Sequence, residues 1–239
     1  MKKFCAHRGL SKLMPENTLP AFAAAYALGA DEIEFDIRLT NDLKLIVSHD
    51  KTLDRISDGE GELWRYTLEE LKKLNVGGRH GWVVHFCTAE EVFEHFANKM
   101  TFNIHLKVHG ENGYLLHELM KLVEKYDAYK SVYFAGSPSE LEWMEKIAPE
   151  IPRVAIQLPN DETSIFEMAK TYNCSGVQFW LGMFDEELIN KLHDNGIFCN
   201  LFYADDEESY KKYFDMGVDT LLTNRMDLAA EFKKTYFCE

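Results

Sequence analysis

The sequence predicts a (β/α)8 barrel, the TIM barrel of the α/β class, on two observations. First, short β-type runs alternate with amphipathic helical stretches along the chain, which is typical of βαβ units on a parallel sheet. Second, eight strand and eight helix candidates in 239 residues match the size of such a barrel. A doubly wound open sheet is the alternative. It would need a glycine-rich turn after the first strand, and HRGLSKLMPENT is not G-x-G-x-x-G.

The candidate elements follow one another in regular order. The strand candidates cover residues 4–6, 32–37, 101–107, 131–135, 153–157, 176–180, 198–202 and 220–223. The helix candidates cover residues 19–28, 89–97, 113–126, 138–147, 162–172, 185–194, 206–216 and 226–236.

One additional β-type run, residues 43–48, interrupts the alternation because only LTND separates it from the second strand. Parallel neighbours cannot be joined by so short a connection, so we expect an antiparallel hairpin. A turn centred on Asn41 and Asp42 would pair residues whose numbers sum to about 83. This register places Glu34 opposite His49 and returns His49 to the barrel mouth.

Residues 50–88 form a long insertion with one short helical piece, residues 67–74, in an otherwise glycine-rich and irregular stretch. A loop of this length inside a compact domain usually serves function, as a lid or a small added subdomain. The sequence contains no repeat and no interdomain linker. We therefore expect a single domain over residues 1–239, with the insertion inside it.

Composition excludes several partners. The formal net charge of −14 argues against nucleic acid or an anionic membrane surface, although local cations can still bind one small anionic substrate. No apolar run reaches the ~18 residues of a membrane span, and MKKFCAHRGL lacks the apolar region of a signal peptide. The five scattered cysteines predict reduced thiols. We expect a cytoplasmic protein. The alternative is a secreted protein whose signal peptide has been removed, because such a form could have this same sequence.

A pair of carboxylates lies in DEIEFDIRL. Glu34 and Asp36 are two residues apart on a strand, so both face one side while Ile33, Phe35 and Ile37 face the other. Two such charges repel unless they share a proton or a cation, and a hard divalent ion is the natural partner for oxygen ligands. The alternative is a solvated strand face. A position at the carboxyl end of a barrel strand favours the metal.

Two histidines and two cations are expected at the same mouth. His7 and His49 carry groups that titrate near neutral pH and could divide the acid and base roles on a phosphodiester. Arg8 offers a planar fork for phosphate oxygens. Lys107 ends its strand as a point charge for a phosphoryl oxygen, or alternatively extends out to solvent.

The sequence resembles the glycerophosphodiester phosphodiesterase family. AHRG, PENTLPAFAAAYALGADEIEFDIRLTND, IVSHDKTLDR, GEG and TLEELKKLN follow in the family's order and spacing over residues 4–76, and a thinner match continues to about residue 230. The resemblance implies a (β/α)8 barrel with a small insertion after the H-D motif. It also implies hydrolysis of glycerophosphodiesters to sn-glycerol 3-phosphate and an alcohol with a divalent cation, Mg²⁺ or Ca²⁺.

The resemblance assigns roles to individual residues. It implies acid–base catalysis by His7 and His49, phosphate binding by Arg8 and Lys107, and metal binding by Glu34 and Asp36. Glu16 and Asn17 of PENT look like residues that support the site or its turn, and Thr18 is a candidate helix N-cap. Aromatic residues near later strand ends could line the alcohol pocket or simply pack: Phe179, Trp180, Phe202 and Tyr203.

The departures from the family pattern fall near the expected mouth. Where the family has N-I-E-x-K, with glutamate as third metal ligand, this chain reads NIHLK and has His105. Later segments read YFAGS, NLFYADD and LLTNR in place of the usual endings. Together they suggest a divergent branch with altered substrate or metal preference.

His105 leaves three alternatives open. It binds the cation through a ring nitrogen, which would favour Mn²⁺ or Zn²⁺. It is a phosphate-facing donor while Glu34, Asp36, water and substrate hold the metal. Or metal binding and activity are lost, leaving a catalytically silent barrel that binds a phosphodiester or phosphosugar. A related phospholipase acting on lysolipids is a further alternative, which the net charge of −14 disfavours.

Overall fold

The computed structural model describes residues 2–157 and 164–236. Its strands are β1 (Lys3–His7), β2 (Glu32–Leu39), β3 (Leu45–Val47), β4 (Thr101–Leu106), β5 (Val132–Gly136), β6 (Arg153–Ile156), β7 (Gly176–Trp180), β8 (Phe198–Phe202) and β9 (Thr220–Thr223). Its α-helices are α1 (Leu19–Ala27), α2 (Leu68–Leu71), α3 (Ala89–Phe96), α4 (Tyr114–Lys125), α5 (Pro138–Ile147), α6 (Ile165–Thr171), α7 (Glu186–Asp194), α8 (Glu207–Asp215) and α9 (Met226–Tyr236).

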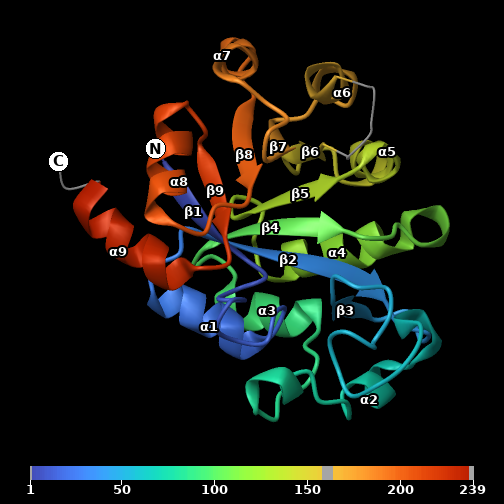
Figure 1. The fold of residues 1–239 in the computed structure, drawn as a ribbon. Helices are drawn as coiled ribbons and strands as arrows, with labels where there is room; N and C mark the ends of the chain where they lie inside the picture. The colour runs from blue at the N-terminus through green and yellow to red at the C-terminus, as the bar shows by residue number, and fades with distance from the viewer. Residues whose placement is uncertain (1, 158–163, 237–239) are drawn as a thin grey trace.

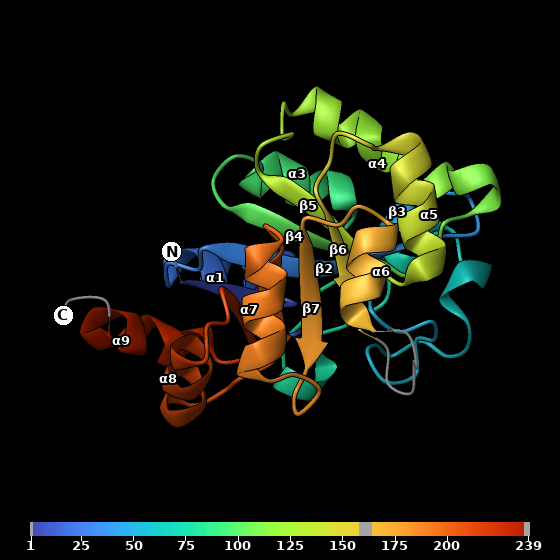
Figure 2. The ribbon, with the colours of Figure 1, turned by 90° about the horizontal axis from the view of Figure 1, so that it is seen from above.

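Eight parallel strands close into a barrel in the order β1-β9-β8-β7-β6-β5-β4-β2, because β1 also pairs with β2. The helices surround this barrel (Figure 1). Neighbouring helices pack on one another, as α4 with α5 and α8 with α9 do (Figure 2). The predicted (β/α)8 barrel is confirmed, with element ends within a few residues of the predicted ones. The predicted helix at 162–172 begins at Ile165 in the structure, and residues 162–163 lie outside the described residues.

The predicted hairpin is present, but its predicted register is wrong by one residue. β3 pairs antiparallel with the end of β2, with Ile37 opposite Val47. The loop between them contains three residues, 41–43, and Leu43 adopts a left-handed conformation with φ of 58°. Such a loop has one residue more than the predicted two-residue turn, so paired residue numbers sum to 84 rather than 83. Glu34 is therefore not paired with His49, which lies beyond the end of β3.

The main apolar core lies between the barrel strands and the helices. Outward-facing residues of the strands, such as Phe35 and Phe102, are fully buried there. Their rings meet edge to face with centroids 5.4 Å apart, and Phe93 of α3 contacts Phe102 in the same way at 5.1 Å. This packing is worth a few kcal/mol for each large side chain and holds the helices against the barrel.

Part of the inside of the barrel is polar, where branched apolar residues are usual. Tyr133 donates its hydroxyl hydrogen to Glu32 over 2.6 Å and accepts one from Asn200 over 3.1 Å. Also inside the barrel, Asn103 donates to Gln178 over 3.0 Å. Because buried polar groups are costly without partners, these hydrogen bonds make a polar interior possible beneath the mouth.

The insertion lies beside β3, outside the ring of helices around the barrel (Figure 1). Its predicted helical piece corresponds to the shorter α2, where Thr67 and Glu70 form a capping box. Short 3₁₀ turns at Leu63–Arg65 and Gly78–His80 were not predicted. A small apolar cluster holds the segment together and includes a residue of β3: Ile46, Leu53, Leu63, Leu71 and Phe86.

Candidate active site

The carboxyl ends of the parallel strands surround a cavity of about 640 Å³. Six of the seven predicted site residues line it: His7, Arg8, Asp36, His49, His105 and Lys107. The seventh, Glu34, is fully buried on β2 and contacts His105. The structure therefore brings all seven together, from elements far apart in the sequence.

Each carboxylate of the β2 pair has one oxygen in a hydrogen bond and one without a donor. Oε2 of Glu34 accepts from the backbone N–H of Arg8 over 2.9 Å, and Oδ2 of Asp36 accepts from Nδ2 of Asn17 over 2.9 Å. Oε1 of Glu34 and Oδ1 of Asp36 are buried and accept no hydrogen bond from the described residues, although Nζ of Lys107 lies 3.0 Å from Oδ1 of Asp36. Buried carboxylate oxygens close together are the ligands a divalent cation uses, so the donor set fits one.

His105 completes this group. Its Nδ1 lies 2.9 Å from Oε1 of Glu34, although not in line for a hydrogen bond, and 3.9 Å from Oδ1 of Asp36. One ligand atom of each of the three residues lies within 4.8 Å of the others. NIHLK and DEIEFDIRL thus contribute their three candidate ligands to one cluster.

A chain of two amides reaches His105 from below. Nε2 of Gln178 lies 3.2 Å from Nε2 of His105, and Oε1 of Gln178 accepts from Asn103. In this arrangement Nε2 of neutral His105 accepts, so the ring proton is on Nδ1 and faces Glu34. If the side-chain amides of Asn103 and Gln178 both rotated by 180°, Oε1 of Gln178 would face His105. The ring proton of His105 would then be on Nε2, and its Nδ1 would be free to bind a cation. The structure therefore accommodates both the ligand and the donor interpretation of His105.

Two cations flank Asp36. Nζ of Lys107 lies 3.0 Å from its Oδ1, and Nε of Arg8 lies 3.5 Å from its Oδ2. Burial by itself would raise the pKa of Asp36, but Lys107 and Arg8 hold it well below the usual value. Lys107 faces the cavity rather than extending out to solvent, so the alternative interpretation of its position is wrong.

The carboxylate of Glu34 is also charged. Burial and the neighbouring Asp36 would raise the pKa of Glu34, but the nearby His105 and His7 leave it below the usual value. Positive groups beside both carboxylates thus favour their ionised forms.

The two histidines differ in environment. His7 is 6% exposed, and its Nδ1 lies 2.7 Å from Oδ1 of Asn224. Burial lowers the pKa of His7, despite the opposing influence of Glu34. His49 is more exposed, and its Nδ1 lies 2.8 Å from Oδ1 of Asp50.

Arg55, in the insertion, connects both sides of the mouth. It donates to both oxygens of Asp50 and to both oxygens of Glu16, over 2.5–3.0 Å. Glu16 in turn accepts from Arg8 over 2.9 Å. Burial opposes the shift, but Arg55 and His49 lower the pKa of Asp50 to about 2. Glu16 thus contacts Arg8, as a supporting role would require, and Thr18 caps α1 as predicted.

Sequence reasoning missed Asn224, Asp205 and Gln178, because their partners lie on other strands. Asn224 and Asp205 fall in LLTNR and NLFYADD, which were noticed only as departures from the family pattern. Trp180, Phe202 and Tyr203 line the cavity, which was one of the two alternatives for them, and Trp180 also packs on Phe202. Phe179 does not, because it points outward and stacks on Phe184 at 4.8 Å.

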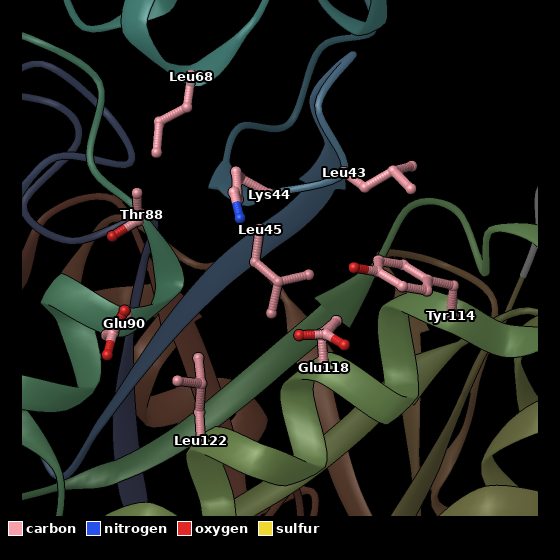
Figure 3. A pocket seen from close by; sticks show the side chains of 9 residues that line it. All are labelled: Leu43, Lys44, Leu45, Leu68, Thr88, Glu90, Tyr114, Glu118 and Leu122. Carbon is pink, nitrogen blue, oxygen red and sulfur yellow. The ribbon is translucent and has the colours of Figure 1, made fainter.

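Two other features of the described residues lack this chemistry. A cavity of about 190 Å³ lies between the hairpin loop and α4, where Leu43, Leu45 and Glu118 face one another (Figure 3). Its lining contains no histidine or arginine.

A second group of potential ligands, at the other end of the barrel strands, is His193, Cys199 and Asp219. Oδ2 of Asp219 already accepts from Nε2 of His193 and from the backbone N–H of Cys199, each over 2.8 Å. These hydrogen bonds account for the group without an ion.

Two histidines, an arginine and a lysine lie at the mouth of a (β/α)8 barrel, beside two carboxylates whose arrangement fits a divalent cation. This is the set of groups that a phosphoric diester hydrolase requires. Residues 7–228 match the Glycerophosphoryl diester phosphodiesterase family, and the chain belongs to that family.

Individual relatives agree. The chain is 32% identical to the glycerophosphodiester phosphodiesterase of Caldanaerobacter subterraneus subsp. tengcongensis, over 92% of each chain. Among solved structures, a phosphodiesterase from Oleispira antarctica in complex with sn-glycerol-3-phosphate has a TM-score of 0.89 at 23% identity, covering 99% of this chain and 97% of that one. A glycerophosphodiester phosphodiesterase from Agrobacterium tumefaciens has a TM-score of 0.83 at 24% identity, covering 97% and 100%. These structural likenesses show the fold.

Proposed function

We propose that the protein hydrolyses glycerophosphodiesters to sn-glycerol 3-phosphate and an alcohol. The observation that carries the proposal is one cavity lined by both histidines, His7 and His49, and by both phosphate-binding candidates, Arg8 and Lys107. Family membership supports it, as do the names of the curated relatives and the product bound to the Oleispira antarctica enzyme.

The residues support an in-line displacement at phosphorus. One histidine takes the proton of the nucleophile, and the other donates a proton to the alkoxide oxygen that leaves. The buried His7, whose pKa is lowered by burial, is neutral at pH 7 and suits the base role, which leaves His49 as the acid. Arg8 and Lys107 neutralise charge on the nonbridging oxygens. The nucleophile is either water or a glycerol hydroxyl of the substrate, which would form a transient cyclic phosphate.

Glu34, Asp36 and His105 would hold a divalent cation. The buried carboxylate oxygens that accept no hydrogen bond support this assignment. The nitrogen of His105 adds Mn²⁺ and Zn²⁺ to the expected Mg²⁺ or Ca²⁺. When bound, the cation supplies charge neutralisation at a phosphoryl oxygen.

Hydrolysis of glycerophosphocholine and of bis(p-nitrophenyl) phosphate, measured over a panel of divalent metals, tests the proposal. We expect turnover that depends on metal and falls by at least about 100-fold in His7→Ala and His49→Ala. Folded protein without turnover under any metal would instead support a silent binding barrel. Turnover of lysophosphatidylcholine alone would support the phospholipase alternative.

We also propose that residues 1–239 form one domain and that the protein is cytoplasmic. The insertion shares its apolar cluster with Ile46 of β3, and Arg55 joins it to Glu16, which supports a single unfolding transition. Among the described residues, four cysteines are free and buried, which suits a reducing compartment: Cys5, Cys87, Cys174 and Cys199. None of the described helices is long and apolar enough to cross a membrane. Calorimetry and cell fractionation test the two proposals.

A further inference from the structure

Asn224, directly after β9, bridges two parts of the mouth. On one side its backbone N–H donates to Oδ1 of Asp205 over 2.7 Å, and its Nδ2 donates to Oδ2 of Asp205 over 2.9 Å. On the other side its Oδ1 lies 2.7 Å from Nδ1 of His7 and accepts from the hydroxyl of Ser11 over 2.9 Å. Both side-chain atoms of the amide are therefore occupied.

The carboxylate of Asp205 decides which way this amide points. An ionised carboxylate only accepts hydrogen bonds, so the NH2 group of Asn224 must face it. The reverse orientation would bring two oxygens within 2.9 Å of each other. Oδ1 of Asn224 consequently faces His7, and Nδ1 of His7 must be the donor. The lone pair of His7 is then on Nε2.

We propose that Asn224 and Asp205 are positioning residues that hold His7 in the Nδ1–H tautomer, so that Nε2 is the basic atom in the cavity. The inference rests on the proposed function. In the base step Nε2 forms a bond to the proton of the nucleophilic hydroxyl, whose O–H bond breaks as its oxygen attacks phosphorus. The Nδ1–H bond stays intact, and its hydrogen bond to Asn224 then stabilises the imidazolium.

The environment of Nε2 explains why such a device is needed. Oε2 of Glu34 lies 3.9 Å from Nε2 of His7 and favours a proton on that atom. Asn224 opposes this by offering an acceptor to Nδ1 at the shorter distance of 2.7 Å. Tyr203 stacks on the ring with centroids 5.2 Å apart, which restricts its rotation. Glu34 and Asn224 thus favour different tautomers of His7, and the closer contact with Asn224, which Asp205 orients, favours the Nδ1–H form.

The test combines a spectroscopic and a kinetic measurement on the full-length protein. Long-range ¹H–¹⁵N correlations of ¹⁵N-histidine protein, with His7 assigned by its loss in His7→Gln, report the tautomer directly. We expect the Nδ1–H pattern in the wild type and its loss in Asn224→Leu. We expect kcat for glycerophosphocholine to fall about 100-fold in Asn224→Leu and about tenfold in the milder Asp205→Asn, with KM within about twofold. The exposed Asn195→Asp is the matched control and should change neither readout.

The outcomes separate this inference from the proposed function. An Nε2–H pattern for His7 in the wild type would overturn the inference whatever the activity, and so would kcat retained within twofold in both folded variants. An Nδ1–H pattern in a wild type that hydrolyses no phosphodiester would support the tautomer assignment and overturn the proposed function. Because Asp205→Asn preserves side-chain size, it serves if Asn224→Leu does not fold.

Discussion

Nδ1 of His105 lies 2.9 Å from Oε1 of Glu34, at the place where the family resemblance leads one to expect a third carboxylate. Both side chains are buried, and Asp36 is paired in register with His105 on the adjacent strand. With a histidine there, the site has one carboxylate fewer to face a cation. This loss of negative charge lowers the electrostatic advantage of binding one.

Replacing His105 by glutamate should restore that advantage. His105→Glu is expected to bind Mg²⁺ and Ca²⁺ about tenfold more tightly, because one more anionic ligand faces the cation. Without metal it should unfold about 3 kcal/mol more easily, since a third buried carboxylate lacks a partner. Titration calorimetry and urea unfolding with and without metal measure both effects. The control His105→Gln adds no charge, so it should show neither the tighter metal binding nor the loss of stability. Equal metal affinity in wild type, His105→Glu and His105→Gln would contradict the idea that His105 weakens cation binding.

The pH dependence of the reaction should reflect the burial of His7. Burial lowers its pKa below 6.5, and a general base acts only when neutral. The activity, kcat/KM, should therefore persist below pH 6.5 and decline only at more acidic pH. Profiles from about pH 4.5 to 9 check this. The exposed His95→Gln should leave the profile unchanged, and a decline that begins above pH 6.5 would rule out His7 as the neutral base.

Arg55 is expected to matter for catalysis although it does not line the cavity. It orients Asp50, which holds His49, and Glu16, which holds Arg8. Arg55→Met should lower kcat between about 10- and 100-fold because both groups lose their orientation.

The matched control for Arg55 is Arg65→Met. Arg65 forms its ion pair with Glu62 inside the insertion, on an exposed surface, at 3.0 Å. Its replacement should leave kcat within about twofold, since exposed pairs of this kind contribute little. Equal losses in the two variants would show that the effect comes from the insertion in general.

Asp50 should contribute to stability at mildly acidic pH. Its folded-state pKa is lowered from 3.8 to about 2, so its contribution is fully present above pH 3.8 and is lost as the pH falls toward 2. Urea unfolding should show a stability difference between wild type and Asp50→Asn at pH 5.5 that shrinks by pH 2.5. Asp194→Asn, at an exposed position, should show a constant difference. If the difference in unfolding free energy between wild type and Asp50→Asn grew as the pH fell, it would contradict this prediction.

The polar floor of the barrel should be a stability element rather than a catalytic one. Tyr133→Phe removes the hydroxyl that donates to Glu32 over 2.6 Å and leaves a buried carboxylate oxygen without that donor. We expect a loss of about 1–3 kcal/mol in the free energy of unfolding, with kcat unchanged. The exposed Tyr129→Phe should alter neither. A large kcat effect in folded Tyr133→Phe would connect the floor to the chemistry.

Most of the fold could be predicted, because alternation of strands and helices is a local property of the chain. The i, i+2 spacing of Glu34 and Asp36 likewise places both carboxylates on one face before anything is known of their neighbours. The hairpin followed from the short LTND connection. Its register did not, because the left-handed residue Leu43 adds one position to the loop, and no pattern in the flanking strands signals this.

The barrel and the shared face of Glu34 and Asp36 could be read from the sequence, since both depend on local periodicity. The seven candidate site residues came from short motifs and the family resemblance. How their side chains are oriented depends on contacts between distant strands. Asn224 reaches His7 across 217 positions, and Gln178 reaches His105 across 73. Barrel closure creates these hydrogen bonds by bringing side chains of separate strands into one interior. In each of these hydrogen bonds, the chemical type of the neighbouring partner, carboxylate or amide, decides which atom donates and which accepts. Those partners become neighbours only when the barrel closes.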